Sequence, residues 1–273
     1  MRFELGLYQV EVATEFGPRV TSLRLGDGPE TFVELGPDQG LPHGDDLFRF
    51  RGGHRLWAAP EVPDISYAPD DHPCQVTESD GAVEISAPVD AAGLIKEITL
   101  TADGDTLVVS HRLTSGRGGS ISVAPWAISQ MPLGGTAVLP LVGEDTAPTA
   151  NRYLVLWPYT SLEDRRVTVN EDVLELHAVE GPQIKLGVGP TPGRLGYFNE
   201  GFVFVKEIEP VGGRAVPDFG AVGQVYAGQG FCELESVGGL AELSEGESAV
   251  LTERWAVVDC GDIESAISVT VGS

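Results

Sequence analysis

"IKEITLTADGDTLVVSHRLT", residues 95–114, decides the class of fold. Two runs rich in β-branched and aliphatic residues each place apolar side chains at every second position, as strands with one buried face do. The Asp103-Gly104 pair between the two runs is typical of a tight hairpin turn. We therefore predict two antiparallel strands joined by a short turn.

The same pattern recurs from one end of the chain to the other. Short β-branched runs such as "YQVEVAT" (8–14), "RYLVLWPY" (152–159) and "AISVTVG" (266–272) are separated by Gly, Pro, Asp or Asn. The best helix candidate, "DIESAIS" (262–268), is one or two turns at most. Neither a repeat nor a low-complexity linker divides the chain. We predict a single all-β domain over residues 1–273, a sandwich or a larger pair of stacked, mostly antiparallel sheets.

Charge and cysteine content restrict the partners and the compartment. A formal net charge of -24 repels nucleic acid and anionic membranes, so we exclude both as partners. The N-terminal residues 1–12 resemble a strand rather than a signal peptide, and no window is long and apolar enough to cross a membrane. Cys74, Cys232 and Cys260 show no CxxC or metal-ligand spacing. We expect a reduced, cytoplasmic protein without a metal or cofactor.

"RGGHRLWAAPE" (51–61) is the first candidate binding segment. Its paired glycines allow a sharp bend or the close approach of a ligand. Past the bend, Arg55 and Trp57 share one strand face, while His54 lies on the other. A guanidinium can donate to sugar hydroxyls, an indole can cover the apolar face of the ring, and Arg51 adds a second donor. The alternative is that Arg55 pairs with an acid and Trp57 belongs to the core.

"GFCELES" (230–236) carries two glutamates, either of which is a candidate for a general base. Glu233 and Glu235 share one strand face, and Cys232 and Leu234 share the other. We predict that the Cys/Leu face packs into the core. The glutamate face then borders either a ligand groove or open solvent, and the pattern does not decide between these alternatives.

His54 and His111 are the candidate acids, because an imidazole exchanges protons near neutral pH. His111 lies in phase with Leu107, Val109 and Leu113 on an apolar strand face. A histidine in such a position is more often a hydrogen-bonded core residue than a catalyst, and that alternative stays open.

Trp126 and Lys206 complete the set of candidate site residues. Trp126, in "APW", can stack on a sugar or belong to the core. Lys206 is one of three lysines and lies in phase with Phe204 and Ile208. It is either an ordinary strand residue that extends its amine to solvent or a group that faces a sugar hydroxyl or a carboxylate such as Glu233.

Four segments together resemble the galactose mutarotase-like superfamily, whose members include aldose 1-epimerases and glucose-6-phosphate 1-epimerases. They are "FGPRVTSLRL" (16–25), "RGGHRLWAAPE", the strand pair over 106–131 and the closing unit over 230–258. "GGHRLW-x-APE", "APW" and "FVK" resemble the signatures of a subgroup without an assigned activity. The resemblance implies a galactose mutarotase-like β-supersandwich, and it places the base on the strand of Glu233 and Glu235. Where the superfamily has its catalytic histidine, this chain has Pro125 and Trp126.

We therefore predict a protein that binds a small-molecule carbohydrate and acts as an aldose 1-epimerase-like isomerase. Such an enzyme needs a base for the proton on O1 and an acid for the ring oxygen. The alternatives are a sugar-binding protein without catalysis and a sheet surface used for protein assembly. Whether the chain forms a homodimer is left open. The candidates are, as base, Glu233 or Glu235; as acid, His54 or His111; and for substrate binding, Arg51, Arg55, Trp57, Trp126 and Lys206.

Overall fold

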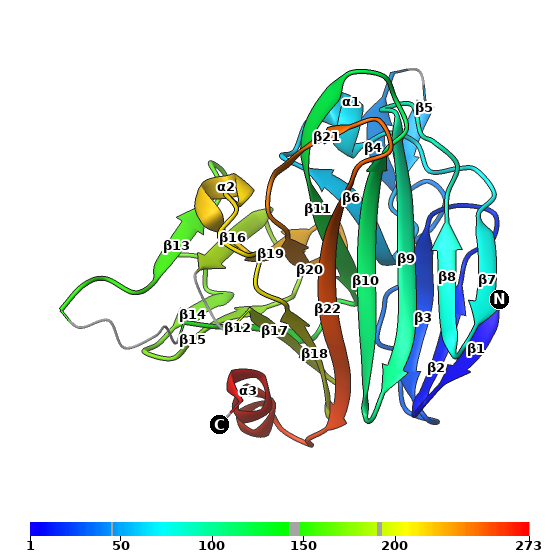
Figure 1. Ribbon diagram of the computed structural model, residues 1–273. Coiled ribbons are helices and arrows are strands. Elements are labelled where there is room, and N and C mark those ends of the chain that lie inside the picture. Colours follow the sequence, from blue (N-terminus) through cyan, green and yellow to red (C-terminus); the bar gives the residue numbers. More distant parts are fainter. Residues whose placement is uncertain (45, 142–147, 190–192, 273) are drawn as a thin grey trace.

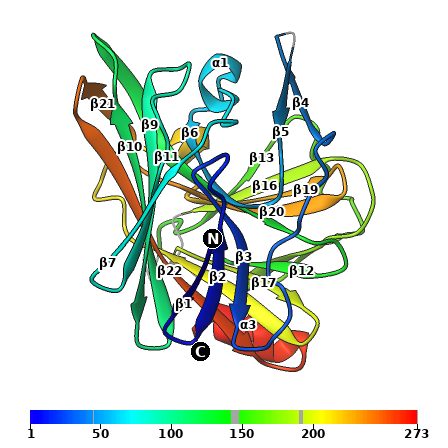
Figure 2. The ribbon, with the colours of Figure 1, turned by 90° about the vertical axis from the view of Figure 1, so that its right-hand side faces the viewer.

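The computed structural model describes residues 1–44, 46–141, 148–189 and 193–272, which form two facing β-sheets (Figures 1 and 2). Sheet A has the order β1 (Arg2–Leu5), β2 (Tyr8–Val12), β3 (Arg19–Leu25), β6 (Gly53–Ala59), β11 (Ser120–Met131), β20 (Phe231–Val237), β19 (Gly223–Gly228), β16 (Ile184–Gly189) and β13 (Tyr153–Leu156), and β21 (Ala241–Ser244) pairs with β11. Sheet B has the order β14 (Val167–Val169), β15 (Val173–His177), β12 (Thr136–Pro140), β17 (Arg194–Asn199), β18 (Phe202–Ile208), β22 (Ser248–Asp259), β10 (Thr106–Ser115), β9 (Leu94–Asp103), β8 (Ala82–Ser86) and β7 (Gln75–Ser79).

Within the described residues, three short helices and one separate hairpin accompany the two sheets. The hairpin consists of β4 (Gly40–His43) and β5 (Asp46–Arg49), and the helices are α1 (Pro63–Ser66), α2 (Pro217–Gly220) and α3 (Ile263–Val271). None of these helices has the length and hydrophobicity that crossing a membrane requires, within the part of the chain that the structure describes.

The hairpin predicted from residues 95–114 is confirmed. β9 and β10 pair antiparallel, with Asp103 opposite Thr106 at the turn and Leu113 opposite Lys96 farther along. Leu107, Val109 and Leu113 are buried, so the alternation of apolar residues correctly indicates the inner face of β10. The prediction of an all-β, mainly antiparallel fold is confirmed as well.

Two hydrophobic clusters lie on opposite faces of sheet A. The larger cluster fills the space between the sheets and includes Leu56 of β6, Leu234 of β20 and Trp255 of β22. The smaller one is aromatic and includes Phe48, Trp57, Trp126 and Phe231. Figure 2 shows the β4–β5 hairpin and α1 on this second face, above β6 and β20. Sheet A is therefore covered on both faces near β6. The β4–β5 hairpin and α1 cover the second face only in part, and a pocket remains there.

The paired glycines of the "RGG" segment serve backbone packing. Gly52 and Gly53 have φ values of 79° and 72°, a conformation that favours glycine. A Cβ on Gly52 would lie 1.9 Å from the carbonyl oxygen of Val33, and one on Gly53 would lie 2.3 Å from that of Val20. Close contact with neighbouring main chain, rather than with a ligand, explains the pair.

The C-terminal segment corrects two predictions. Residues 266–272 are not a strand, because α3 continues through them to Val271 and is longer than the one or two turns expected. The Asp262 side chain caps the helix by accepting from the backbone N–H of Ser265, and Gly272 ends it in the left-handed conformation. Ala266 and Thr270, four residues apart, are buried against sheet B. Capping and packing thus override the β propensity of Ile and Val.

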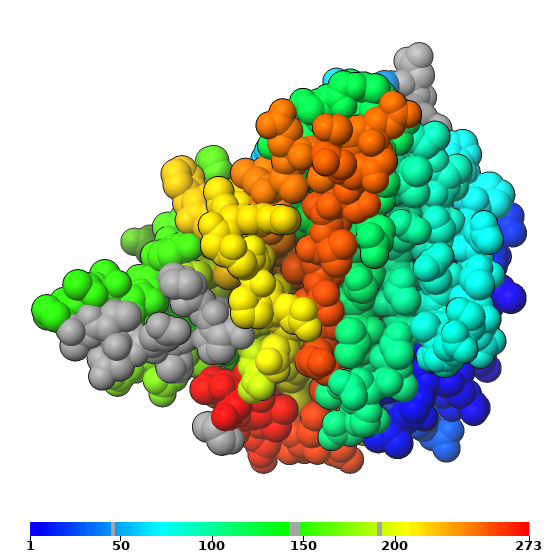
Figure 3. Space-filling model, viewed as in Figure 1, coloured from blue at the N-terminus to red at the C-terminus, as the bar shows by residue number. Residues whose placement is uncertain are grey.

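The outer face of sheet B is polar. Figure 3 shows an unbroken surface over β22, β10, β9 and β8 on the side turned to the viewer. The side chains there alternate with the buried ones and include Glu97, Thr99, Ser110, Arg112, Thr252 and Arg254. Polar side chains therefore predominate on this face, where Val250 is an apolar residue that is 44% exposed.

Candidate functional site

A pocket opens on the face of sheet A that is turned away from sheet B. Its volume is about 210 Å³. The strands β6, β20 and β16 supply its floor, and the hairpin and the chain around α1 supply part of its wall. It is lined by Leu41, Phe50, Arg55, Trp57, Glu61, Tyr67, Trp126, Tyr159, Gln183, Lys185, Tyr226, Gln229, Phe231, Glu233 and Glu235. The lining thus combines aromatic rings with five ionisable carboxyl, amine and guanidinium groups.

Glu233 lies at the floor of this pocket. Its carboxylate accepts from Arg55 Nη2 at 2.9 Å and from Gln130 Nε2 at 3.1 Å. Burial raises the pKa of Glu233 to about 7, because Arg55 only partly offsets the loss of water and the adjacent Glu235 opposes ionisation. Near neutral pH this carboxyl is therefore able both to accept and to release a proton.

Glu235 is held in a different way, although it is two residues away on the same strand face. Its Oε2 accepts from Lys185 Nζ at 2.7 Å and from Trp126 Nε1 at 2.8 Å. The Lys185 ammonium lies 4.6 Å from the ring centroid of Trp126 and 4.8 Å from that of Trp157. Two donors and two aromatic rings therefore fix this ion pair in place.

The face predictions for β6 and β20 are confirmed. Arg55 and Trp57 point to the pocket, with the guanidinium 4.2 Å from the indole centroid. Glu233 and Glu235 also point to the pocket, while Cys232 and Leu234 lie in the core between the sheets. Arg55 pairs with a carboxylate, as the alternative interpretation held, and that carboxylate belongs to the pocket itself.

The more accessible aromatic surface comes from three tyrosines at the rim. Tyr159 is 46% exposed, whereas Trp57 and Trp126 are 6% and 3% exposed. The Tyr67 hydroxyl donates to the carboxylate of Glu61. Burial raises the pKa of Tyr159 and Tyr226, and the nearby pocket glutamates raise it further, so these phenols keep their protons at neutral pH. A ligand that enters the pocket therefore meets tyrosines before it meets tryptophans.

Several buried polar atoms at the pocket wall have no hydrogen-bond partner among the described residues. They are Arg55 Nε and Nη1, Trp57 Nε1 and Glu235 Oε1. Each such atom costs about 1–3 kcal/mol. The pocket therefore has buried hydrogen-bond donors and an acceptor that no described residue satisfies. Such groups are common at sites that bind polar ligands.

His54 and His111 do not reach the pocket. Both are fully buried between the sheets, where His54 Nε2 lies 2.7 Å from His111 Nε2. His111 Nδ1 faces the carbonyl oxygen of Leu251 at 3.2 Å, so this nitrogen carries the hydrogen. It follows that His54 Nε2 donates to His111 Nε2, and that His54 Nδ1 accepts from the hydroxyl of Ser129 at 2.8 Å. Burial lowers the pKa of both rings, in accord with two neutral imidazoles.

Lys206 belongs to the same inter-sheet cluster and also faces away from the pocket. It pairs with Glu253 at 3.0 Å rather than with Glu233, and it donates to the carbonyl oxygens of Ala127 and Leu234 across the gap. His54, His111 and Glu253 offer three possible metal-ligand atoms within 4.8 Å of one another. The Lys206 ammonium already neutralises Glu253, so the donor chemistry does not suit a cation.

Arg51 lies outside the pocket as well. Its guanidinium pairs with Asp71 and lies 4.1 Å from the ring centroid of Phe16. It lines a separate surface groove with Glu11, Glu30 and Glu34. The structure therefore brings together Arg55, Trp57, Trp126, Glu233 and Glu235, and it places Arg51, His54, His111 and Lys206 elsewhere.

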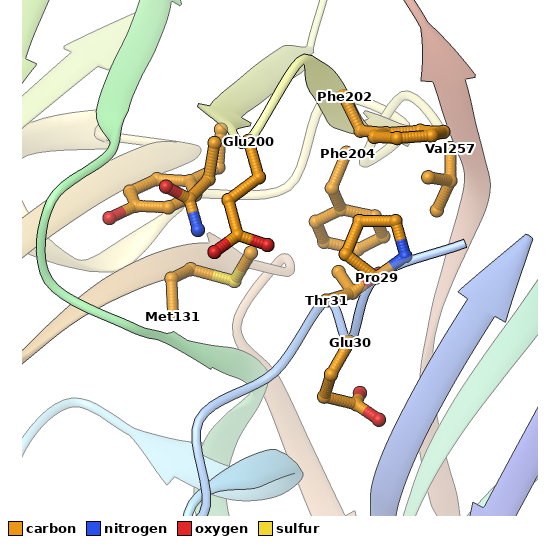
Figure 4. A pocket seen from close by; sticks show the side chains of 10 residues that line it. Pro29, Glu30, Thr31, Met131, Glu200, Phe202, Phe204 and Val257 are labelled. Atoms are coloured by element: carbon orange, nitrogen blue, oxygen red, sulfur yellow. The ribbon is translucent and has the colours of Figure 1, made fainter.

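A much smaller cavity, of about 20 Å³, opens near β11, β18 and β22. Figure 4 shows Met131, Phe202, Phe204 and Val257 around it, with Glu200 at its side. This volume holds a single water molecule but not a sugar ring.

Lys185 and the three rim tyrosines are not among the site residues predicted from the sequence. Lys185 alternates with apolar residues in "IKLGVG" (184–189) and is one of three lysines. These two features are the signals in the sequence that could have identified it. Tyr67, Tyr159 and Tyr226 stand in separate segments, so only the folded chain brings them together.

Comparisons with known proteins agree on the fold. No family model matches the chain, and no curated protein matches it. A galactose mutarotase-like protein from Lactobacillus casei is 14% identical over 94% of this chain and 99% of its own, with a TM-score of 0.55. An aldose epimerase homologue from C. elegans is 11% identical over 95% of this chain and 98% of its own, with a TM-score of 0.53. The chain therefore has the galactose mutarotase-like β-sandwich fold, and identities this low carry the fold alone.

Proposed function

We propose that this protein binds a small carbohydrate in the pocket of sheet A and acts on its anomeric centre, as an aldose 1-epimerase-like enzyme. The observation that carries the proposal is Glu233, a carboxyl group with a pKa raised to about 7 on the floor of an aromatic pocket. A base with this pKa has the proton affinity that anomeric proton transfer needs at neutral pH. The galactose mutarotase-like β-sandwich fold supports the same assignment.

In this proposal Glu233 accepts the proton from the O1 hydroxyl of the sugar. The ring then opens as a second group protonates the ring oxygen, and rotation about C1–C2 lets it close on the other face. Lys185 is the candidate for the second group, because it is a cation held at the pocket by Glu235. Arg55 orients Glu233, and Tyr159 covers the apolar face of the ring.

A sugar-binding protein without turnover is the second candidate. It is favoured by the residues that line the pocket, none of which is a histidine among those the structure describes. Both of the predicted imidazole acids lie in the inter-sheet cluster instead. A binder would use the aromatic rim and the two ion pairs without exchanging protons.

Proton NMR with free glucose and galactose separates the two candidates. Saturation transfer from protein to sugar reports binding, and magnetisation exchange between the α and β anomers reports turnover in the same sample. We expect both signals from the unaltered protein. Glu233→Gln, which keeps the size of the side chain but cannot take up a proton, should reduce anomer exchange by about 100-fold or more and retain saturation transfer.

Glu78→Gln is the matched control, since it makes the same chemical change at an exposed position on the far edge of sheet B. It should leave both signals unchanged. Saturation transfer without exchange would assign the protein to the binding class. The absence of both signals for both sugars would contradict a carbohydrate function for the pocket.

A further inference from the structure

We propose that the pocket selects sugars without negative charge and rejects sugars that carry a phosphate or a carboxylate. This inference rests on the proposed function, because it names the class of sugar that the same pocket takes. Two independent features support it: the pairing of every arginine in residues 49–55, and the balance of charge in the pocket lining.

The arginines that a phosphate would need are already paired with carboxylates. Arg49 Nη1 lies 2.8 Å from Asp71, and Arg51 pairs with the same carboxylate. Arg55 pairs with Glu233 at 2.9 Å. The sequence concentrates positive charge in this segment, but the fold neutralises each guanidinium. A phosphate at Arg49 or Arg51 would have to displace an existing ion pair. Arg55 keeps two donors without a partner among the described residues, Nε and Nη1, but they are buried beside the Trp57 indole and belong to a guanidinium whose charge Glu233 already offsets.

Arg19 extends the same pattern. It is fully buried, pairs with Asp70 at 2.6 Å and donates to the backbone carbonyls of Phe50 and Gly52. It serves to hold the "RGG" bend in place. Neither Arg19, Arg49 nor Arg51 is among the described residues that line the pocket.

The charges of the lining itself favour a sugar without negative charge. Two cationic and three acidic side chains line the pocket, namely Arg55, Lys185, Glu61, Glu233 and Glu235. Both cations are buried and paired, so Glu61 at the rim is the acid left without a cationic partner in this set. Once Glu233 is ionised, above its pKa of about 7, a ligand phosphate or carboxylate therefore meets a surplus of negative charge in a partly desolvated space.

The pKa values of the rim phenols reflect the negative charge of the pocket glutamates. After burial, the largest influence that raises the pKa of Tyr159 comes from Glu235, followed by Glu61, and for Tyr226 it comes from Glu233 and Glu235. Both side chains line the pocket. Each is therefore under the influence of negative charge, and an anionic ligand would enter that same field.

A series of hexoses that differ only at C6 tests the inference. For glucose, the members are 6-amino-6-deoxyglucose, glucose itself, glucuronate and glucose 6-phosphate, which carry charges from positive to doubly negative. A galactose series is measured in parallel. We expect saturation transfer and titrated affinity to be highest for the amino and neutral members, and to fall by about tenfold or more for each added negative charge.

Glu61→Gln sharpens the test, since it removes one negative charge at the rim and keeps a hydrogen-bond acceptor for Tyr67. This variant should reduce the preference for neutral over anionic members several-fold. Glu78→Gln changes the net charge equally at an exposed position on an edge strand of sheet B, and should leave the preference unchanged. Added salt should weaken the preference of the unaltered protein, as expected for charge repulsion.

The outcomes separate this inference from the proposed function. Glucuronate or glucose 6-phosphate bound as tightly as the neutral parent sugar would overturn the inference alone. An unchanged preference in Glu61→Gln would also count against it. The absence of saturation transfer from every member of both series would overturn the proposed function, and this inference with it.

Discussion

Glu233 and Glu253 are both buried glutamates beside a cation, yet they differ in the direction of their pKa. Glu233 faces the pocket, where burial and the neighbouring Glu235 raise its pKa to about 7 despite Arg55. Glu253 lies between the sheets, where burial also opposes ionisation but the Lys206 ammonium lowers its pKa below the usual range. Trp255 Nε1 adds a hydrogen bond at 2.7 Å.

The difference lies in the neighbours rather than in the depth of burial. A carboxylate with dedicated donors and no adjacent acid stays ionised, and Glu253 thereby holds the Lys206 ammonium that donates to two carbonyls of sheet A. A carboxylate that shares its surroundings with a second acid is poised to exchange a proton. The comparison therefore separates a structural cluster from a candidate catalytic one on opposite faces of the same sheet.

The largest expected effect comes from the structural cluster. Lys206→Met leaves Glu253 buried without its cation, so we expect the free energy of unfolding to fall by about 3–5 kcal/mol. Urea denaturation measures this change. Lys206→Met combined with Glu253→Gln should recover part of the loss, because the double variant buries no unpaired charge. A loss below about 1 kcal/mol for the single variant would contradict the stabilising role of this buried ion pair.

The pH dependence of stability should follow from the two buried histidines. Their pKa in the folded protein lies below the usual 6.5, so the unfolded chain binds protons that the folded chain does not. Stability present above pH 6.5 is therefore lost on acidification, by about 1.4 kcal/mol per pH unit for each histidine. Urea denaturation at a series of pH values between 5 and 8 measures this slope.

Glu233 should act in the opposite direction over part of the same range. Its folded pKa of about 7 exceeds the usual 4.5, so its contribution to stability declines as the pH rises through this window. Glu233→Gln should remove this term and make the loss on acidification steeper. A stability that is flat or that increases on acidification below pH 6.5 would contradict the neutral, buried state of the two imidazoles.

A smaller effect is expected at the rim of the pocket. Tyr159→Ala removes an exposed ring, so sugar affinity should fall by about 0.5–1.5 kcal/mol while stability is retained. Saturation-transfer titration measures the affinity, and Tyr159→Phe should keep most of it. Tyr153, which is 39% exposed and is not part of the pocket lining, supplies the matched control Tyr153→Ala. Equal losses at both positions would remove Tyr159 from the proposed site.

The smallest effect is expected at Arg51. Its ion pair with Asp71 is partly exposed, so Arg51→Ala should cost at most about 1 kcal/mol of stability. Sugar affinity should remain within about twofold, because Arg51 lies outside the pocket. A clear loss of affinity, measured by the same titration, would return Arg51 to the set of sugar-binding residues.

Strand faces are the part of the site that the sequence predicts well. Alternation in "GFCELES" correctly separates Glu233 and Glu235 from Cys232, and alternation after the "RGG" bend separates Arg55 from His54. The hairpin over residues 95–114 follows from its Asp-Gly turn in the same way. These features are local, and a period of two fixes them without knowledge of the rest of the fold.

Long-range partners are the part that the sequence could not predict. The in-phase position of His111 indicates a buried face, but not that His54 approaches it from the other sheet. Lys206 finds Glu253 instead of Glu233 for the same reason, since β18 pairs with β22 and not with β20. The end of α3 was mistaken for a strand because its cap and its contacts with sheet B outweigh local propensity.

The most direct test of the difference between the two glutamates is a titration of the glutamate carboxyl groups by carbon-13 NMR. We predict one carboxyl signal with a midpoint near pH 7, which is absent from the Glu233→Gln variant. We also predict a second signal, lost in Glu253→Gln, that stays in the ionised position down to acid pH. The raised pKa of Glu233 would be contradicted if every glutamate titrated below pH 5, or if the signal near pH 7 persisted in Glu233→Gln.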